Sequence, residues 1–190
     1  MQLRVSDRVY YSVSAKGKPL LRGSTLSMRV DQRTLGLDPK IENAKTRTVN
    51  REIEVPVPRK SARVHESFNE LRLDMKGNYA VVFRAYDEGV AYRIETSLPQ
   101  SEIKIYNEEA QFRFAGDYKV YYPKEDSFFS HNEREFPLTA MKGIGPTMIS
   151  SLPAVVDAEG IKVAIAESDI DDYPGLWLRG GGTSSCPLNC

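Results

Sequence analysis

The sequence has no net charge and no long hydrophobic run. Its 26 Lys and Arg residues are balanced by 26 Asp and Glu residues, and no basic stripe is present. The composition therefore gives no electrostatic footprint for nucleic acid. Apolar runs such as Ala80–Phe83, which stops at Arg84, are far shorter than the ~20 residues that span a membrane. We expect neither nucleic-acid nor membrane partners.

Cysteine is almost absent as well. The two cysteines, Cys186 and Cys190, lie in the last five residues, where they cannot staple a core, and they make only a weak zinc pattern. The N-terminus lacks the apolar core of a signal peptide. The protein is therefore either intracellular or preceded by a signal outside this numbering.

Short strand patterns dominate the chain, and no segment shows sustained helical periodicity. Apolar and polar residues alternate over 66–74, and the segments 79–86 and 90–96 form a hairpin pattern around Gly89. Within this hairpin, Arg84 and Arg93 are predicted to pair with carboxylates. Many short strands separated by turns predict an all-β fold, an antiparallel β-sandwich.

Two long connections interrupt the strand pattern. Residues 31–62 are polar and contain three prolines, which predicts a long excursion with at most one edge strand over 51–55. The second connection, over about 123–152, contains the stretch FFSHNEREF (128–136). Long ordered loops in compact β domains are often functional, so this connection is a candidate site.

The stretch FFSHNEREF gathers His131, Asn132, Glu133 and Glu135. In an extended segment Glu133 and Glu135 project from one face. Carboxylate and amide oxygens suit Ca²⁺ better than zinc, and two carboxylates with a water could also perform acid–base chemistry on a glycosidic bond. Composition alone favours a solvated polar loop.

A second acidic segment, AESDIDDYPGLWL (166–178), contains Glu167, Asp169, Asp171 and Asp172. Its spacing does not match an EF-hand loop. The acids could cap a turn or cluster beside a cation. Trp177 either packs inward or offers an aromatic platform.

The order of these segments resembles the N-terminal domain of glycoside hydrolase family 97, which consists of α-glucosidases and α-galactosidases largely from Bacteroidetes. The resemblance covers residues 1–179 and rests on FRAYDEGVAYRI, EEAQFRF, YYPKEDSFFSHNEREF and IAESDIDDYPGLWL, with RVYYSVSAKGKPLLRGSTLSM at the start. It implies a galactose-mutarotase-like super-sandwich that precedes a (β/α)₈ barrel, in a periplasmic or secreted protein. Residues 180–190 are expected to be an unstructured or truncated tail.

The resemblance also implies roles for individual residues. Glu133 is the first choice and Glu167 the second for a ligand that this domain lends to a calcium ion, with His131 and Asn132 shaping the loop behind it. Thr147 and Met148 lie where family members approach an α-linked oligosaccharide. The barrel carries the catalytic carboxylates, so the chain alone is expected to be inactive and to bind calcium only together with the barrel.

Two other functions remain open from the sequence. A stand-alone carbohydrate-binding sandwich would use Trp177 and the tyrosines as stacking surfaces, and burial of Trp177 would count against it. A mutarotase-like epimerase would need a His–Glu pair across a concave sheet face, for which His131 and Glu133 are the nearest candidates.

Overall fold

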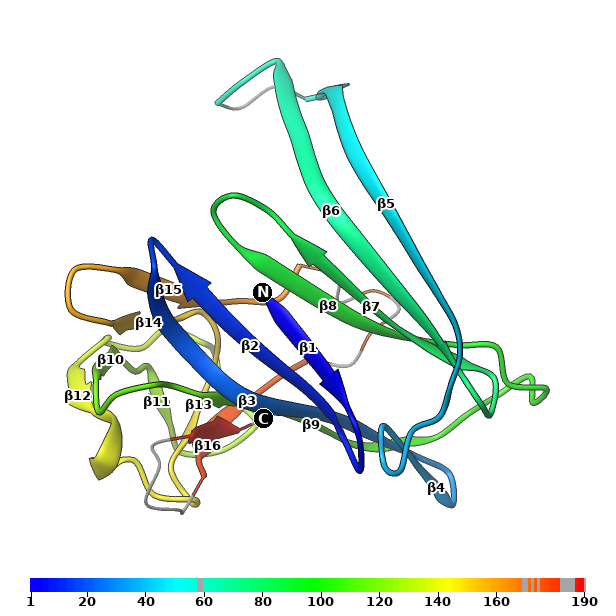
Figure 1. Ribbon diagram of the computed structural model, residues 1–190. Coiled ribbons are helices and arrows are strands. Elements are labelled where there is room, and N and C mark those ends of the chain that lie inside the picture. The colour runs from blue at the N-terminus through cyan, green and yellow to red at the C-terminus, as the bar shows by residue number, and fades with distance from the viewer. Residues whose placement is uncertain (58–59, 169–170, 172, 174, 182–186, 190) are drawn as a thin grey trace. The chain divides into compact units, whose positions relative to one another are not determined.

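The computed structural model describes residues 1–190 except 58–59, 169–170, 172, 174, 182–186 and 190 (Figure 1). The described residues form seventeen strands and one 3₁₀ turn, η1 (Met141–Gly143). The strand pairings are antiparallel, which confirms the predicted all-β sandwich. Contacts divide the chain into two units: unit 1 is Asp38–Ile103 with Met1, and unit 2 is Gln2–Leu37 with Lys104–Cys190.

The described part of the chain contains no helix long and apolar enough to cross a membrane.

Unit 1 is a four-stranded antiparallel meander. Its strands follow sequence order: β5 (Ile41–Glu54), β6 (Arg63–Met75), β7 (Tyr79–Ala85) and β8 (Val90–Thr96). Gly77 and Asn78, between β6 and β7, both have positive φ angles, as the tight hairpin turn there requires. The first five residues of β7, Tyr79 to Phe83, are all buried, so β7 contributes much of the core of this unit.

Strand β5 corrects the prediction for residues 31–62. Where one edge strand over 51–55 was expected, β5 runs from Ile41 to Glu54 and pairs with β6 along its length. Every residue of β5 except Val49 is exposed. An edge strand that faces water on both sides has no apolar alternation to reveal it, because main-chain hydrogen bonds to its neighbour hold it in place.

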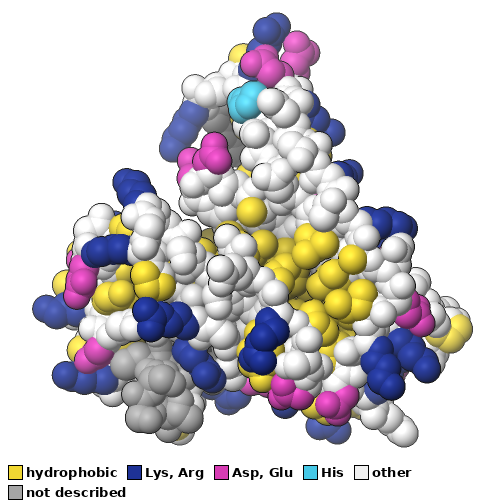
Figure 2. All heavy atoms as spheres, viewed as in Figure 1, with side chains coloured by type: hydrophobic (Ala, Val, Ile, Leu, Met, Phe, Trp, Pro, Cys, Tyr) yellow, Lys and Arg dark blue, Asp and Glu magenta, His cyan; other side chains and the backbone are white. Residues whose placement is uncertain are grey.

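Charged side chains gather near the turn that joins β5 and β6 (Figure 2). Guanidinium nitrogens of Arg63 lie 3.9 Å from a carboxylate oxygen of Glu52 and 3.6 Å from one of Glu54. Charge of this kind discourages another strand from adding to an exposed edge.

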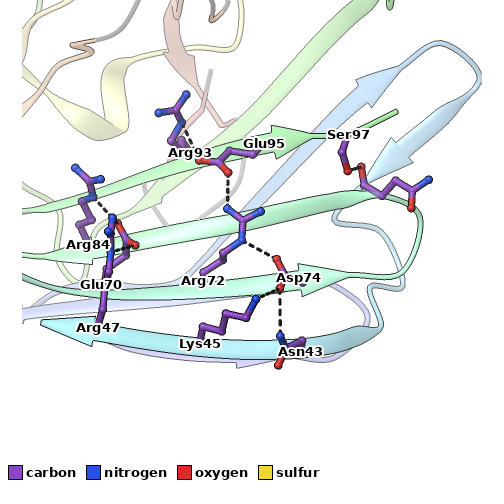
Figure 3. Close-up of polar contacts among 11 residues, drawn as sticks. Asn43, Lys45, Arg47, Glu70, Arg72, Asp74, Arg84, Arg93, Glu95 and Ser97 are labelled. Atoms are coloured by element: carbon purple, nitrogen blue, oxygen red, sulfur yellow. Dashed lines mark hydrogen bonds and ion pairs between the residues drawn. The ribbon is translucent and has the colours of Figure 1, made fainter. Parts of the chain in front are cut away.

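Ion pairs cross the strands of unit 1 (Figure 3). Glu70, on β6, accepts hydrogen bonds from Arg47 on β5 (2.5 Å) and from Arg84 on β7 (2.8 Å). Arg93 lies 3.5 Å from Glu95. The prediction that Arg84 and Arg93 pair with carboxylates is confirmed. The bond from Arg47, and then that from Arg84, hold the pKa of Glu70 below its ordinary value against the opposing effect of burial.

Unit 2 contains the two remaining sheets. The larger has the order β1-β2-β3-β9-β17-β16-β13-β11, with β4 paired to β3, and the smaller has the order β12-β10-β14-β15. The larger comprises β1 (Gln2–Val5), β2 (Val9–Ala15), β3 (Lys18–Val30), β4 (Arg33–Leu35), β9 (Ile105–Arg113), β11 (Lys124–Glu125), β13 (Ile149–Ser150), β16 (Leu178–Gly180) and β17 (Pro187–Asn189). The smaller comprises β10 (Lys119–Tyr121), β12 (Leu138–Ala140), β14 (Ala154–Asp157) and β15 (Lys162–Ile165).

The core of unit 2 draws on both sheets. Val9, Leu26 and Val30 of the larger sheet and Val120 and Val156 of the smaller are almost completely buried. Tyr122, 1% exposed, follows β10, and its single hydroxyl proton is shared between the carbonyl oxygens of Met148 (2.6 Å) and Leu178 (3.1 Å), which lie on or beside strands of the larger sheet. These bonds link the end of the smaller sheet to β13 and β16.

Part of the segment 180–190, which was expected to be an unstructured or truncated tail, lies in strands. Gly180 ends β16, and β17 joins β16 to β9. Gly180 packs closely against the folded chain: a Cβ atom at this position would lie 1.8 Å from the carbonyl oxygen of Ile144. Only a residue without a side chain fits, so position 180 belongs to the folded unit.

We expect Gly180→Ala to destabilise the protein, because the new methyl group would meet backbone atoms that cannot rotate away. Overpacking of this kind costs about 1–3 kcal/mol, measurable as a lower midpoint in thermal or urea unfolding. Gly143→Ala is the control, since a Cβ there meets nothing within 4 Å. Equal midpoints for the two variants would contradict the close approach at Gly180.

Candidate functional site: a loop held by a buried carboxylate

The connection between β11 and β12, residues 126–137, contains FFSHNEREF and presents much of it to solvent. Phe129 is 99% exposed, Phe128 is 66% exposed and Phe136 is 47% exposed. The side chain of Glu133 is 90% exposed, and Glu135 is also exposed. Exposed phenylalanine rings beside exposed carboxylates on one loop indicate an interaction surface.

Beneath this loop lies a carboxylate that sequence reasoning did not single out. Glu125, on β11, has a side chain with no exposed surface. Its Oε2 accepts hydrogen bonds from Ser130 Oγ (2.6 Å) and Arg134 Nε (2.7 Å), and its Oε1 accepts one from Ser151 Oγ (3.2 Å). One buried group thus joins β11, two points on the loop and the residue after β13.

These donors lower the pKa of Glu125. The hydrogen bond from Ser130 is the largest cause, and the bond and positive charge of Arg134 act in the same direction, while burial opposes them. The carboxylate is therefore ionised at neutral pH, as its three donors require.

Within the loop, local hydrogen bonds organise the residues around Glu133. The backbone N–H of Asn132 donates to Ser130 Oγ (2.9 Å), and that of Glu133 donates to His131 Nδ1 (3.1 Å). The second bond requires His131 Nδ1 to act as an acceptor, and this nitrogen also lies 3.9 Å from Glu133 Oε2. Asn132 has a φ of +58°, the left-handed conformation that asparagine tolerates better than most residues.

The two residues proposed as calcium ligands lie in different settings. Glu133 projects into solvent, whereas Glu167 Oε2 accepts a hydrogen bond from the backbone N–H of Leu176 (3.0 Å). The described residues contain no group of three or more His, Cys, Asp or Glu side chains that could hold a metal ion. Asp169 and Asp172 lie outside the described residues.

An aromatic contact joins the two acidic segments. The rings of Phe128 and Trp177 meet edge to face with their centroids 5.2 Å apart. Trp177 is half-buried, so it acts as a packing partner for the loop rather than a freely exposed platform.

The residues expected to face substrate lie on a separate turn. Thr147 is exposed and Met148 is half-buried. The backbone N–H of Met148 donates to Gly145 O (3.1 Å), and the carbonyl of Met148 receives the Tyr122 hydroxyl (2.6 Å). The turn is thus anchored to the core, and Thr147, like Pro146, faces solvent.

Glu125 was missed because its sequence context gives no warning of burial. It stands between Lys124 and Asp126, both exposed, in a strand of only two residues. A pattern of alternation cannot be read in so short a strand, and a glutamate among charged neighbours is normally solvated. Its donors come from five, nine and 26 positions away, and only the fold brings them together.

Comparison with known proteins gives a consistent family assignment. A family model described as Glycosyl-hydrolase 97 N-terminal matches residues 1–187. A retaining alpha-galactosidase from Bacteroides thetaiotaomicron is 30% identical over 187 residues, covering 93% of this chain and 28% of that protein.

Solved structures show the same fold. A glycoside hydrolase family 97 enzyme from Pseudoalteromonas sp. strain K8, in complex with acarbose, matches with a TM-score of 0.82 at 20% identity, over 98% of this chain and 29% of that one. A beta-arabinopyranosidase matches with a TM-score of 0.79 at 22% identity, over 99% of this chain and 32% of that one. The chain therefore spans less than a third of the length of each of these relatives.

The lowered pKa of Glu125 predicts how stability changes with pH. A carboxyl with a depressed folded-state pKa stabilises the fold above its unfolded pKa, about 4.3, and that stabilisation disappears as the pH falls through the folded value. The wild type should therefore lose more stability than Glu125→Gln between about pH 6 and pH 3.

Urea unfolding at several pH values measures this difference. Glu125→Gln should be less stable than the wild type at neutral pH, with a shallower decline toward acid. Glu133→Gln is the control: its carboxylate is exposed, so its profile should follow the wild type. Parallel profiles for Glu125→Gln and the wild type would show that the Glu125 carboxylate does not contribute as an anion.

Proposed function

Because this chain belongs to the glycosyl-hydrolase 97 N-terminal family, we propose that it serves as the N-terminal β module of an α-glycoside hydrolase acting on α-linked oligosaccharides. In this proposal the module packs on a catalytic (β/α)₈ barrel that is not among these 190 residues. It lends the carboxylate of Glu133 to a calcium site at the junction. The greater length of the relatives, of which the chain matches 28–32%, supports a modular role.

The observation that carries the proposal is the contrast between Glu133 and its surroundings. The Glu133 carboxylate is 90% exposed, yet residues on either side of it, Ser130 and Arg134, are tied to the buried Glu125. A solvated carboxylate in a long polar loop would ordinarily have no such support. An exposed ligand on a supported loop is suited to bind something outside this chain.

Calcium fits Glu133 only as a shared ion. Ca²⁺ takes six to eight oxygen ligands, and the described residues provide no cluster of three candidate side chains. One carboxylate supplies one or two of those oxygens, so the catalytic barrel and water would supply the others. When bound there, the ion would contribute positive charge near the substrate and the catalytic carboxylates.

The exposed phenylalanines suit the packing role. Phe128, Phe129 and Phe136 flank Glu133 on the same loop, and aromatic side chains are enriched among the residues that contribute most to protein interfaces. Burying them against a catalytic barrel would remove apolar surface from water and place Glu133 at the same junction. The acid–base chemistry itself would belong to the barrel.

The geometry does not favour the two other functions. His131 and Glu133 are neighbours on one exposed loop rather than a pair facing each other across a sheet, as an epimerase would need. Trp177 is half-buried against Phe128, which leaves less of its ring for stacking on a sugar.

We expect Glu133→Gln in the full-length parent protein to weaken calcium activation. Loss of one charged oxygen ligand should raise the calcium concentration for half-maximal glycosidase activity by roughly tenfold or more. Activity measured against calcium concentration on an α-linked substrate tests this. Glu135→Gln, two residues away and also exposed, is the matched control. Identical calcium dependence of Glu133→Gln and the wild type would refute the ligand role.

We also expect Phe129→Ser to weaken docking on the catalytic barrel. A central aromatic contact contributes about 2 kcal/mol or more to an interface, which corresponds to a roughly 30-fold change in Kd. Binding of this chain to a separately produced barrel, followed by calorimetry, measures the change. Val57→Ser, which removes a 73% exposed side chain elsewhere, is the control. If both variants bound with the wild-type Kd, Phe129 would lie outside the interface.

A further inference from the structure

We propose that Glu125 is the positioning residue for Glu133. In this proposal the buried carboxylate fixes the conformation of loop 126–137, so that Glu133 is presented outward in one orientation. The consequence for calcium rests on the function proposed above. The consequence for the loop can be tested in this chain alone.

The geometry of one oxygen atom carries the proposal. Ser130 Oγ and Arg134 Nε both donate to Glu125 Oε2, at 2.6 and 2.7 Å. The two ends of the segment 130–134 are therefore drawn to a single point. The three residues between them, with Glu133 among them, have to bulge away from that point and into solvent.

The backbone of the bulge follows the same constraint. Ser130 Oγ donates to Glu125 and accepts the N–H of Asn132 (2.9 Å), so the hydroxyl links the buried oxygen to the chain just before Glu133. Asn132 takes the left-handed backbone conformation, with a φ of +58°. The outward direction of residue 133 is thus determined by the hydrogen bonds of Ser130 with Glu125 and Asn132, rather than by contacts of the Glu133 side chain.

The other carboxylate oxygen connects the bulge to the sheet. Glu125 Oε1 accepts a hydrogen bond from the buried Ser151, and the main chain of Glu125 is paired with Ile149 on β13. The two hydrogen bonds that hold Ser130 and Arg134 are therefore connected, through Glu125, to strands of unit 2. The exposed carboxylate of Glu133 thus lies on an anchored segment.

Only an anion serves all three donors. A carboxylate has two acceptor oxygens with about four lone-pair directions, whereas glutamine, of nearly the same size, has one oxygen and an NH₂ group. In Glu125→Gln at least one donor would face a nitrogen instead of an acceptor, and the Arg134 guanidinium would lose its counter-charge. The isosteric variant should consequently weaken the hydrogen bonds from Ser130 and Arg134 while filling the same space.

Hydrogen exchange on the purified 190-residue chain tests the positioning role directly. In Glu125→Gln, the amides of Asn132 and Glu133, which donate hydrogen bonds in the wild type, should exchange at least about tenfold faster. Those of β5–β8 in unit 1 should keep their protection. Ser130→Ala removes one of the two hydrogen bonds from the loop to Glu125, so it should give the same local pattern of exchange. It replaces Glu125→Gln as the test if that variant folds poorly.

The control is Ser127→Ala. Among the described residues, Ser127 Oγ bonds only to Phe129, donating to its carbonyl oxygen and accepting its N–H, so exchange at 130–136 should stay at the wild-type rate. Unchanged exchange of 130–136 in Glu125→Gln and Ser130→Ala would overturn the proposal. So would a uniform loss of protection in both units, because Glu125 would then support the fold as a whole.

A double-variant cycle in the full-length parent protein separates this inference from the proposed function. If Glu125 acts through Glu133, then Glu125→Gln should raise the calcium requirement, and Glu125→Gln with Glu133→Gln should be no worse than Glu133→Gln alone. Independent, additive effects would overturn the positioning role. If Glu133→Gln left the calcium dependence unchanged while Glu125→Gln still loosened the loop, the calcium function would fail and the positioning of the loop would stand.

Discussion

A charged oxygen that is removed from water has to be met by hydrogen-bond donors, and at Glu125 this requirement shapes the whole candidate site. Its three side-chain donors come from the loop and from the residue after β13. Each donor is necessary because an unmatched buried charge is costly. The loop is therefore closed around the carboxylate, and the residues between its two attachment points are pushed outward.

Glu70 and Glu108 are buried as well, and Glu70 shows how a different setting gives a buried carboxylate a different role. Glu70 is matched by Arg47 and Arg84 on the strands at either side of it, so its partners are already aligned by the sheet (Figure 3). Its network stabilises a polar sheet face. Glu125 is matched by residues that have no strand to align them, and it instead organises an otherwise irregular segment.

Regular alternation made part of the fold predictable. The hairpin of β7 and β8 follows from local patterns. Arg84 reaches Glu70 on the neighbouring strand β6, and Arg93 reaches Glu95 two positions along the same strand, so both ion pairs join residues that sheet geometry already places close together. The strand β5 was largely missed, because both of its faces are exposed to water and its residues show no alternation of apolar and polar side chains. Gly180 was placed in a tail because its close contact with Ile144 spans 36 positions of sequence.

The sequence by itself determined the all-β class and, through the order of its motifs, the family to which the chain belongs. It also identified the stretch FFSHNEREF and the exposed Glu133 within it as the residues to examine. Only the tertiary structure decided which carboxylate is buried and which is presented. Burial of Glu125 depends on donors up to 26 positions away, and folding, not local composition, brings those donors to one point.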